Sequence, residues 1–377
     1  MNKDLQDIVA AFDKIASLGK TAALATLVKV KGSTYRRPGA RMLMTPDGWL
    51  LGSISGGCLE GDVFAHAQQV MDSGKPTLVK YDTTESEDII WGLGLGCQGI
   101  VHVLIEWLTD ESELSPIAFL AECFHRRQTG VLVTVFGVDG RSEIKMGDRL
   151  MLHPDGTVNS NITDSVRSRI IDDAIVAAQS TQSSVKMYQL PAGSVEVFIE
   201  VIQPPVPLII FGAGHDAMPV VRLAKELGWQ VSVVDSRPAY ATTARFPLAD
   251  AVILAHPQAV HEHISIDNRT AAVIMTHNYL HDRELLQTLL PSPLSYLGVL
   301  GPKRRTEQLL QELGRAEQLN HLYSPVGLDI GADTPEAIAL AILAEIQTVL
   351  ANRSGGSLKN RIGPIHIPTK EARGHSQ

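Results

Sequence analysis

The sequence predicts an α/β protein: an N-terminal αβ domain with an internal duplication, followed by a C-terminal Rossmann-like domain built on a doubly wound parallel sheet. Three observations support this prediction. A ten-residue pattern recurs in the first half of the chain, a proline-rich segment follows it, and short β-branched segments then alternate with helical ones. Strands that alternate with helices are typical of a parallel sheet that helices cover on both faces.

The composition is that of a folded, acidic protein. Of the 377 residues, 44% are hydrophobic and 20% are charged, and the formal net charge is −8. That charge disfavours binding to nucleic acid or to an anionic membrane, because both need a basic surface. The longest strongly apolar stretch, residues 337–344, is much shorter than the ~20 residues of a membrane span. The N-terminus lacks a signal-peptide pattern, and three cysteines occur without CxxC spacing, so we expect a cytoplasmic protein.

The first hundred residues show helical and strand patterns in turn. Apolar residues at helical spacing predict one helix over 5–15 and another over 59–71. Apolar and β-branched runs that end at turn residues predict strands over 21–28, 39–48 and 101–107. This first part is therefore expected to mix helices with a sheet.

The next hundred residues resemble the first hundred. Gly39–Gly48 (GARMLMTPDG) aligns with Gly147–Gly156 (GDRLMLHPDG) at an offset of 108 residues. Val103–Glu106 (VLIE) aligns with Val197–Glu200 (VFIE) at an offset of 94 residues. We interpret these matches as an internal duplication, with the two halves at about 1–110 and 111–203.

Two loops distinguish the first copy from the second. Ser53–Glu60 contains two glycines and Cys58, whereas the aligned Asn161–Ser168 contains neither glycine nor cysteine, and residues 91–99 have no counterpart. Both copies keep the scaffold that packing requires, so loops present in only one copy are the better candidates for function. Cys123 lies in a helical stretch of the second copy and is predicted to belong to the core.

A stiff linker, residues 203–207 (QPPVP), separates these copies from the second half of the chain. Beyond it, strands are predicted over 208–211, 230–234, 251–254, 271–276 and 296–300. Thr334 and Pro335 predict the start of the last helix. The predicted domains are 1–203 and 204–352, and the polar residues 353–377 are expected to form a flexible tail.

The segment from Gly212 to Ala217 (GAGHDA) fits the dinucleotide-binding pattern G-x-G-x-x-G/A between a strand and a helix. Gly212 would make the turn, Gly214 would let a phosphate approach the backbone, and helix N-terminal amides would face the anion. Asp235 ends the second strand, where an acid can bind a ribose hydroxyl. We therefore expect a phosphate-bearing ligand here; the alternative is a Rossmann fold that binds nothing.

In such sheets the ligand lies outside the carboxyl ends of the first and fourth strands. We therefore expect His215, and His277 with Asn278, to border the pocket, although one histidine could instead cap backbone groups. Lys303 and Arg304 follow the fifth strand and are further candidates for an anionic ligand. The alternative for these two is a solvated basic helix face.

The two loops of the first copy contain cysteines beside glycines. Cys58 follows Gly56 and Gly57 at the start of a helix, where partial positive charge favours a thiolate. Cys97 follows Gly96 in a glycine-rich segment whose backbone N–H groups could converge on an anion. The alternative for both is a buried structural cysteine.

Arg36, Arg37 and Arg41 lie close together in the first copy. Arginine suits bidentate recognition of phosphate or carboxylate groups. Arg41 aligns with Arg149 of the second copy and is predicted to be structural. Arg36 is the strongest ligand-binding candidate of the three, because it aligns with an isoleucine, and Arg37 is a weaker one.

Together these motifs resemble the XdhC/CoxI family. The N-terminal resemblance rests on residues 32–40 (GSTYRRPGA), 52–60 (GSISGGCLE) and 94–97 (GLGC). The C-terminal resemblance rests on residues 211–215 (FGAGH), 234–238 (VDSRP), 275–278 (MTHN) and 327–331 (GLDIG). It spans residues 21–350, with departures at Tyr35, Gln98 and Pro302.

Members of this family are accessory proteins of xanthine dehydrogenase and related molybdenum hydroxylases. The resemblance implies a chaperone that binds molybdenum cofactor (molybdopterin, alone or as a dinucleotide), supports its sulfuration and inserts it into the apo-hydroxylase. It places Cys58 and Cys97 near the molybdenum or its sulfur. It places the phosphate end at the glycine turn, with Arg237 among the cofactor-binding residues. A cysteine desulfurase is a candidate partner and a homodimer is expected, while catalytic turnover is left open.

Two other functions fit the same residues. An NAD(P)-dependent oxidoreductase could use Gly212, Gly214 and Asp235 for its cofactor, with His215 or His277 as the general acid or base. A sulfur- or nucleotidyl-transfer enzyme could act on the molybdenum cofactor itself. Nicotinamide binding would favour the first alternative, and a persulfide on a cysteine would favour sulfur transfer.

Overall fold

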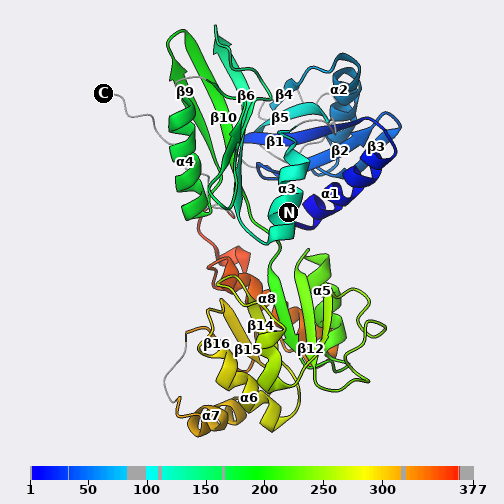
Figure 1. Cartoon of the computed structure of the whole chain (residues 1–377), viewed down its shortest axis with the longest axis vertical. Coiled ribbons are helices and arrows are strands. Elements are labelled where there is room, and N and C mark those ends of the chain that lie inside the picture. Colours follow the sequence, from blue (N-terminus) through cyan, green and yellow to red (C-terminus); the bar gives the residue numbers. More distant parts are fainter. Residues whose placement is uncertain are drawn as a thin grey trace. The chain divides into compact units, whose positions relative to one another are not determined.

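The computed structural model describes residues 2–32, 34–82, 99–108, 113–163, 166–315, 320–363 and 365. The loop with Gly96 and Cys97 lies outside the described residues, as do residues 364 and 366–377 of the predicted tail. The chain divides into two compact units, with the division between Pro204 and Pro205 (Figure 1). Within the described residues, none of the helices combines the length and apolar character of a membrane-spanning segment.

The N-terminal unit contains two antiparallel five-stranded sheets with the same strand order. The orders are β3-β2-β1-β5-β4 and β8-β7-β6-β10-β9. The sheets consist of β1 (Ala22–Gly32), β2 (Arg41–Thr45), β3 (Gly48–Gly52), β4 (Thr77–Asp82) and β5 (Gly99–Leu108), then β6 (Gly130–Gly140), β7 (Arg149–Leu152), β8 (Val158–Ser160), β9 (Ser184–Leu190) and β10 (Gly193–Ile202). β1 and β6 differ by 108 residues, and β5 and β10 by 94, so the spacing in sequence corresponds to equivalent strands.

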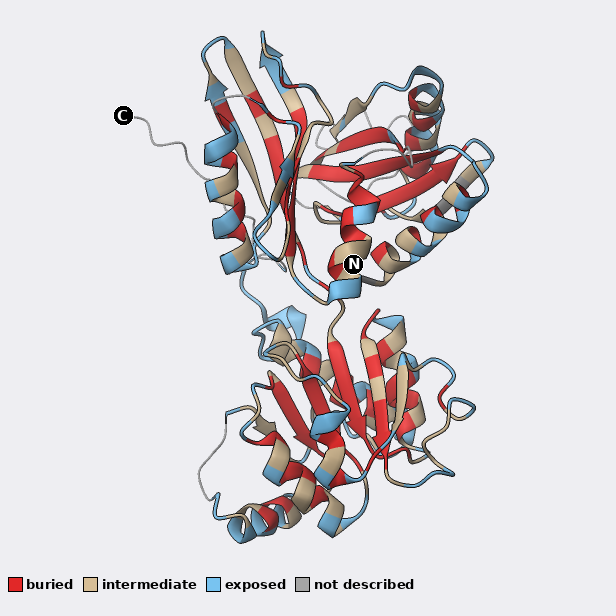
Figure 2. Cartoon of the chain, in the orientation of Figure 1, coloured by how far each residue is buried: buried red, intermediate tan, exposed pale blue. Residues whose placement is uncertain are grey.

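Helices cover the sheets of this unit because apolar residues line one face of each helix. α2 (Glu60–Ser73) packs on the first sheet and α4 (Val166–Ser180) on the second, each over its own buried core (Figure 2). α1 (Asn2–Ser17) and α3 (Pro116–Arg126) join a core shared by both sheets. Cys123 of α3 is fully buried there, and burial raises the pKa of its thiol to about 12, which confirms its predicted place in the core.

Two ion pairs connect the copies reciprocally. Arg41 of β2 donates to both carboxylate oxygens of Glu200 in β10, at 2.8 and 2.5 Å. Arg149 of β7 donates to Glu106 of β5 at 2.5 Å. The residues that matched in the alignment therefore pair across the copies, each arginine with the glutamate of the other copy. The predicted structural role of Arg41 is confirmed, since its side chain is only 2% exposed.

The C-terminal unit contains a six-stranded sheet in which every neighbouring pair is parallel. The strand order β13-β12-β11-β14-β15-β16 corresponds to 3-2-1-4-5-6 within the unit, which is the Rossmann order. The strands are β11 (Pro207–Phe211), β12 (Gln230–Asp235), β13 (Ala251–Leu254), β14 (Ala271–Ile274), β15 (Tyr296–Val299) and β16 (Leu322–Tyr323). This topology confirms the predicted fold class.

Helices lie on both faces of the parallel sheet. α5 (Ala217–Glu226) and α8 (Pro335–Leu350) enclose one core. α6 (Tyr279–Leu289), α7 (Lys303–Glu312) and the 3₁₀ helix η1 (Pro257–Glu262) enclose the other. Thr334 caps α8 as predicted, accepting a hydrogen bond from Ala337 N, and a short 3₁₀ helix η2 (Leu358–Asn360) follows. The strand order reverses between β11 and β14, so their carboxyl ends form the switch point of the sheet.

Candidate functional site

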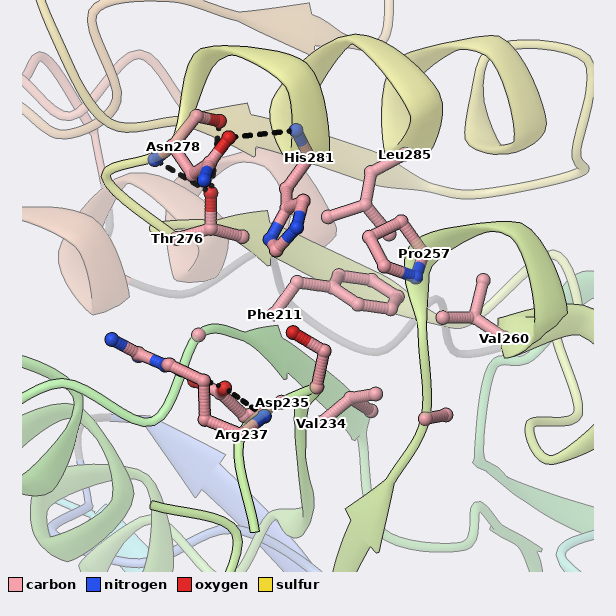
Figure 3. Close-up of a pocket in the computed structure, with 13 residues that line it drawn as sticks. Phe211, Val234, Asp235, Arg237, Pro257, Val260, Thr276, Asn278, His281 and Leu285 are labelled. Carbon is pink, nitrogen blue, oxygen red and sulfur yellow. Dashed lines mark hydrogen bonds and ion pairs between the residues drawn. The ribbon is translucent and has the colours of Figure 1, made fainter. Parts of the chain in front are cut away.

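A pocket opens at the carboxyl ends of the central strands in the C-terminal unit (Figure 3). Phe211, Pro257, Val260 and Leu285 form its apolar wall, toward which the imidazole of His281 points. The pocket is lined in full by Phe211, Gly212, Val234, Asp235, Ser236, Arg237, Ala255, Pro257, Val260, Thr276, Asn278, His281 and Leu285. Its cavity volume is about 60 Å³, far below the few hundred Å³ of a typical ligand pocket, so it can enclose only part of a cofactor.

Asp235, at the end of β12, holds the glycine turn in place. Its Oδ2 accepts hydrogen bonds from Ala213 N and Arg237 Nη2, both at 2.7 Å, and its Oδ1 accepts from Arg237 N and Nε, both at 2.9 Å. Burial by itself raises the pKa of this carboxyl, but the hydrogen bonds from Arg237 and Ala213 outweigh burial and keep the pKa below its ordinary value. The ionised carboxylate thus already accepts four hydrogen bonds, and it is the group to which a ribose hydroxyl would otherwise donate.

Arg237 brings a positive charge to the pocket. Its side chain is 47% exposed, and its guanidinium lies 3.8 Å from the ring centroid of Tyr240. Asp235 binds the Nε and Nη2 groups of this guanidinium, and neither of those bonds uses Nη1. The pocket therefore presents an oriented cation rather than a free acid, an arrangement suited to an anionic ligand.

Gly212 turns the chain at the switch point. Its φ is +114°, and a Cβ at this position would overlap the carbonyl of Met275 at the end of β14. Its backbone N–H donates to Val234 O at 2.8 Å. Only glycine therefore allows β11 and β14 to end so close together.

The histidines flank the turn in different ways. His277, with φ +56°, places its Nε2 at 2.7 Å from Oδ2 of Asp216, the residue just before α5. Its neighbours Thr276 and Asn278 line the pocket, but His277 itself does not. His215 lines a separate groove of about 500 Å³ between α5, the segment 244–248 and the start of α8. The structure thus places His277 at the switch point and His215 on the α5 side of it.

Asn278 acts as the N-cap of α6. Its side-chain oxygen accepts hydrogen bonds from Leu280 N at 3.0 Å and His281 N at 3.1 Å. This side chain therefore has a structural task, although it also borders the pocket.

The basic run after β15 points mostly away from the pocket. Lys303 and Arg304 are exposed in the first turn of α7, and neither is a lining residue. Arg305 donates to the buried Asp282 at 2.7 Å. Lys303 and Arg304 thus lie on a solvated face of α7, and binding of an anion by them stays a prediction.

In the N-terminal unit, the turn before α2 is organised around Ser55. Its hydroxyl oxygen accepts from the N–H groups of Gly57, Cys58 and Leu59, at 3.1, 3.2 and 3.2 Å, and donates to Glu60 at 2.5 Å. Burial raises the pKa of Glu60, but hydrogen bonds from Ser55 and the backbone bring it below its ordinary value. The N–H groups expected to favour a Cys58 thiolate are therefore directed at Ser55 instead.

Cys58 is half-buried, and its Sγ lies 3.4 Å from Ser55 Oγ. The ring of Tyr35 lies over Gly56, so that a Cβ there would be 3.8 Å from Tyr35 Cγ. Tyr35 is 72% exposed. Among the described residues no three His, Cys, Asp or Glu side chains form a metal-binding group. Cys58 thus lies two residues after a glycine that an exposed aromatic ring covers, with Ser55 as the recorded neighbour of its thiol.

Arg36 and Arg37 have different surroundings in the structure. Arg36 donates to Ser53 Oγ at 2.8 and 3.1 Å and pairs with Asp4 of α1 at 2.5 Å, so it connects three segments of the fold. Arg37 is half-buried, and burial lowers the pKa of its guanidinium. The structure records no side-chain acceptor for Arg37 among the described residues. Both arginines remain candidates for a ligand anion, and Arg36 would have to release Asp4 or Ser53 to bind one.

Sequence reasoning missed Ser55, Asp216 and His281. Each lies inside or next to a motif that was recognised, but its importance depends on where its side chain points. Asp216 occupies a variable position of the glycine pattern, so only the contact with a residue 61 positions later marks it.

Comparison with known proteins agrees with these motifs. Residues 208–346 match the family model described as the XdhC Rossmann domain, and residues 16–82 match the XdhC and CoxI family. The chain is 38% identical over 327 residues to a Bacillus subtilis protein named as a probable xanthine dehydrogenase subunit, covering 86% of this chain and 92% of the relative. The chain belongs to the XdhC/CoxI family. The resemblance inferred from the motifs is therefore confirmed.

Two further proteins extend the comparison. The molybdenum cofactor insertion chaperone PaoD of Escherichia coli is 25% identical over 336 residues, with 88% of this chain and 84% of PaoD covered. A crystal structure from Bacillus halodurans, described as a xanthine dehydrogenase, superimposes with a TM-score of 0.76 at 30% identity. It covers 93% of this chain and 98% of that one.

Proposed function

We propose that this XdhC/CoxI protein binds molybdenum cofactor, supports its sulfuration and inserts it into a molybdenum hydroxylase of the xanthine dehydrogenase type. An accessory role is supported by the names of its relatives, one of which is a molybdenum cofactor insertion chaperone. The structural observation that carries the proposal is the engaged Asp235. With its carboxylate bound to Ala213 and Arg237, the pocket favours an anion over a ribose diol.

The residues present suit the two chemically different ends of this cargo. The phosphate end needs backbone N–H groups and a cation. Arg237 can supply the cation. Gly214 and the start of α5 are the source of N–H groups, because those of Gly212 and Ala213 already donate to Val234 and Asp235. The molybdenum end is thiophilic, and a cysteine thiolate is a soft ligand. Cys58 is half-buried and therefore partly accessible; Cys97, which the family pattern pairs with it, lies outside the described residues. The partner is an apo-hydroxylase, with a cysteine desulfurase as the sulfur source and a homodimer as the expected assembly.

The hydrogen bonds of Asp235 also argue against the nicotinamide alternative, because the acid that would bind the ribose already accepts from four donors. Fluorescence titration with NADH and NADPH tests it, and saturable binding would revive it. For the sulfur-transfer alternative, mass spectrometry of the purified protein would detect a persulfide on Cys58 or Cys97.

Reconstitution of a hydroxylase tests insertion. Apo-hydroxylase is mixed with sulfurated cofactor, with and without this protein, and substrate turnover is measured. We expect the wild type to raise turnover and Cys58→Ala to remove most of that gain, while Cys123→Ala, at the buried thiol, serves as the matched control. Equal turnover with and without the wild-type protein would contradict an insertion role.

A further inference from the structure

An acidic side chain of the chain itself lies over the glycine turn. Asp216 Oδ1 is so close to Gly214 that a Cβ added to that glycine would overlap it. Oδ2 of the same carboxylate lies 2.7 Å from His277 Nε2. Asp216 is the N-cap residue of α5, yet its side chain makes no capping hydrogen bond to that described helix. The carboxylate is therefore held over the turn, facing the end of β14, rather than bonded to its own helix.

The space next to Gly214 is the phosphate position of a Rossmann domain. The second glycine of the pattern lacks a side chain so that a phosphate can approach the backbone. Here the space next to Gly214 is occupied by a carboxylate, which is also an anion. A phosphate and the Asp216 carboxylate would repel each other at such short range, so both cannot be there at once.

The turn itself is fixed, which leaves Asp216 as the element that can move. The N–H of Ala213 donates to Asp235 at 2.7 Å, and its carbonyl accepts from Arg245 Nη2 at 3.1 Å. The carboxylate, in contrast, is held by the imidazole of His277, which is 62% exposed. Rotation of one side chain is enough to clear the place above Gly214.

We propose that Asp216 is a specificity-determining residue, whose carboxylate occupies the phosphate place of the glycine turn and must be displaced by the ligand. A small free anion makes few contacts outside the glycine turn, so it cannot displace the Asp216 carboxylate and is rejected. A large phosphate-bearing ligand makes additional contacts outside the turn and can displace the carboxylate. This selectivity rests on the proposed function, because it assumes that the turn receives the phosphate end of a cofactor. It would keep the site free of cellular phosphate and pyrophosphate.

The test compares binding of inorganic pyrophosphate to the full-length wild type, Asp216→Asn and Asp216→Ala by isothermal titration calorimetry. Asp333→Asn is the control, because it removes the same charge from an exposed position of the same unit. We expect both Asp216 variants to bind pyrophosphate at least tenfold more tightly than the wild type, and the control to match the wild type. The two Asp216 variants differ in size and polarity, so a folding defect in one does not remove the test.

Binding of molybdenum cofactor to the wild type is measured in the same series. If the wild type binds cofactor but both Asp216 variants bind pyrophosphate within twofold of the wild type, the role of Asp216 is wrong and the proposed function stands. If neither the wild type nor the Asp216 variants bind cofactor or pyrophosphate, the glycine turn is no phosphate site and the proposed function fails with it.

Discussion

Gly212 and Gly214 are two residues apart, yet a methyl group would have different effects at the two positions. At Gly212 it would overlap the backbone carbonyl of Met275, and φ is +114°. At Gly214 it would overlap only the end of the Asp216 side chain, which can rotate. We expect Gly212→Ala to lower the free energy of unfolding by about 3 kcal/mol or more, and Gly214→Ala by about 1 kcal/mol or less. Urea denaturation of both variants measures this difference, and equal losses would show that the turn is not held as described.

Asp235 couples the stability of the C-terminal unit to pH. Its folded-state pKa lies below the ordinary value, so its contribution is present above about pH 4 and is lost as the pH falls through the folded value. At pH 7, Asp235→Asn should cost about 2–3 kcal/mol, because it weakens charge-assisted hydrogen bonds in a buried place. The difference in the free energy of unfolding between wild type and variant should become smaller below about pH 4. Urea titrations at pH 7 and in acid measure this difference, and a difference that stayed constant or grew would contradict the prediction.

At the scale of elements, the reciprocal ion pairs join the two sheets of the N-terminal unit. The Arg41 and Glu200 side chains are 2% and 4% exposed, and those of Arg149 and Glu106 are 12% and 8% exposed. Removing one partner from a buried pair leaves a charge without compensation. We expect Glu200→Gln to cost about 3–5 kcal/mol and Glu106→Gln less, since water reaches the second pair more easily.

Denaturant unfolding of both single variants gives these losses. As a control, replacing Arg41 and Glu200 together by methionine and leucine should recover much of the stability, because no unpaired charge then remains buried. Losses below about 1 kcal/mol in both single variants would mean that the pairs do not hold the copies together.

The elements that sequence predicts well are those with a strong local pattern. The β-branched runs predicted the approximate positions of β11 to β15, and Thr334 predicted the start of α8. β16 has two residues, too few to show a period, and was not predicted. The alignment marked Arg41 as structural, but its partner Glu200 becomes evident only once two sheets pack face to face.

The site was predictable in part, for a similar physical reason. A glycine turn, the strand ends and the acid after the second strand follow from order along the chain. The contacts of each side chain do not follow from that order. Arg36 binds Asp4 and Ser53, and Asp216 contacts His277, which is 61 residues away in the sequence. The motifs therefore located the pocket of the C-terminal unit, whereas the contacts of Arg36 in the N-terminal unit became evident only in the fold.

At the scale of the whole molecule, the two units differ in the chemistry that they offer a ligand. The N-terminal unit carries the half-buried thiol of Cys58, in a glycine-containing loop that only the first of its two related copies has. The C-terminal unit carries a pocket in which a partly exposed arginine lies beside an acid that already accepts four hydrogen bonds.

The most direct measurement is the pterin content of the full-length protein purified from a host that makes molybdenum cofactor. Acid–iodine oxidation converts the bound pterin to fluorescent products that chromatography quantifies. We expect a substantial fraction of wild-type molecules to carry pterin, and Cys58→Ala and Arg237→Ala to retain at least fivefold less. Wild-type protein that carries no pterin, and that also fails to take up added cofactor, would contradict the proposed function.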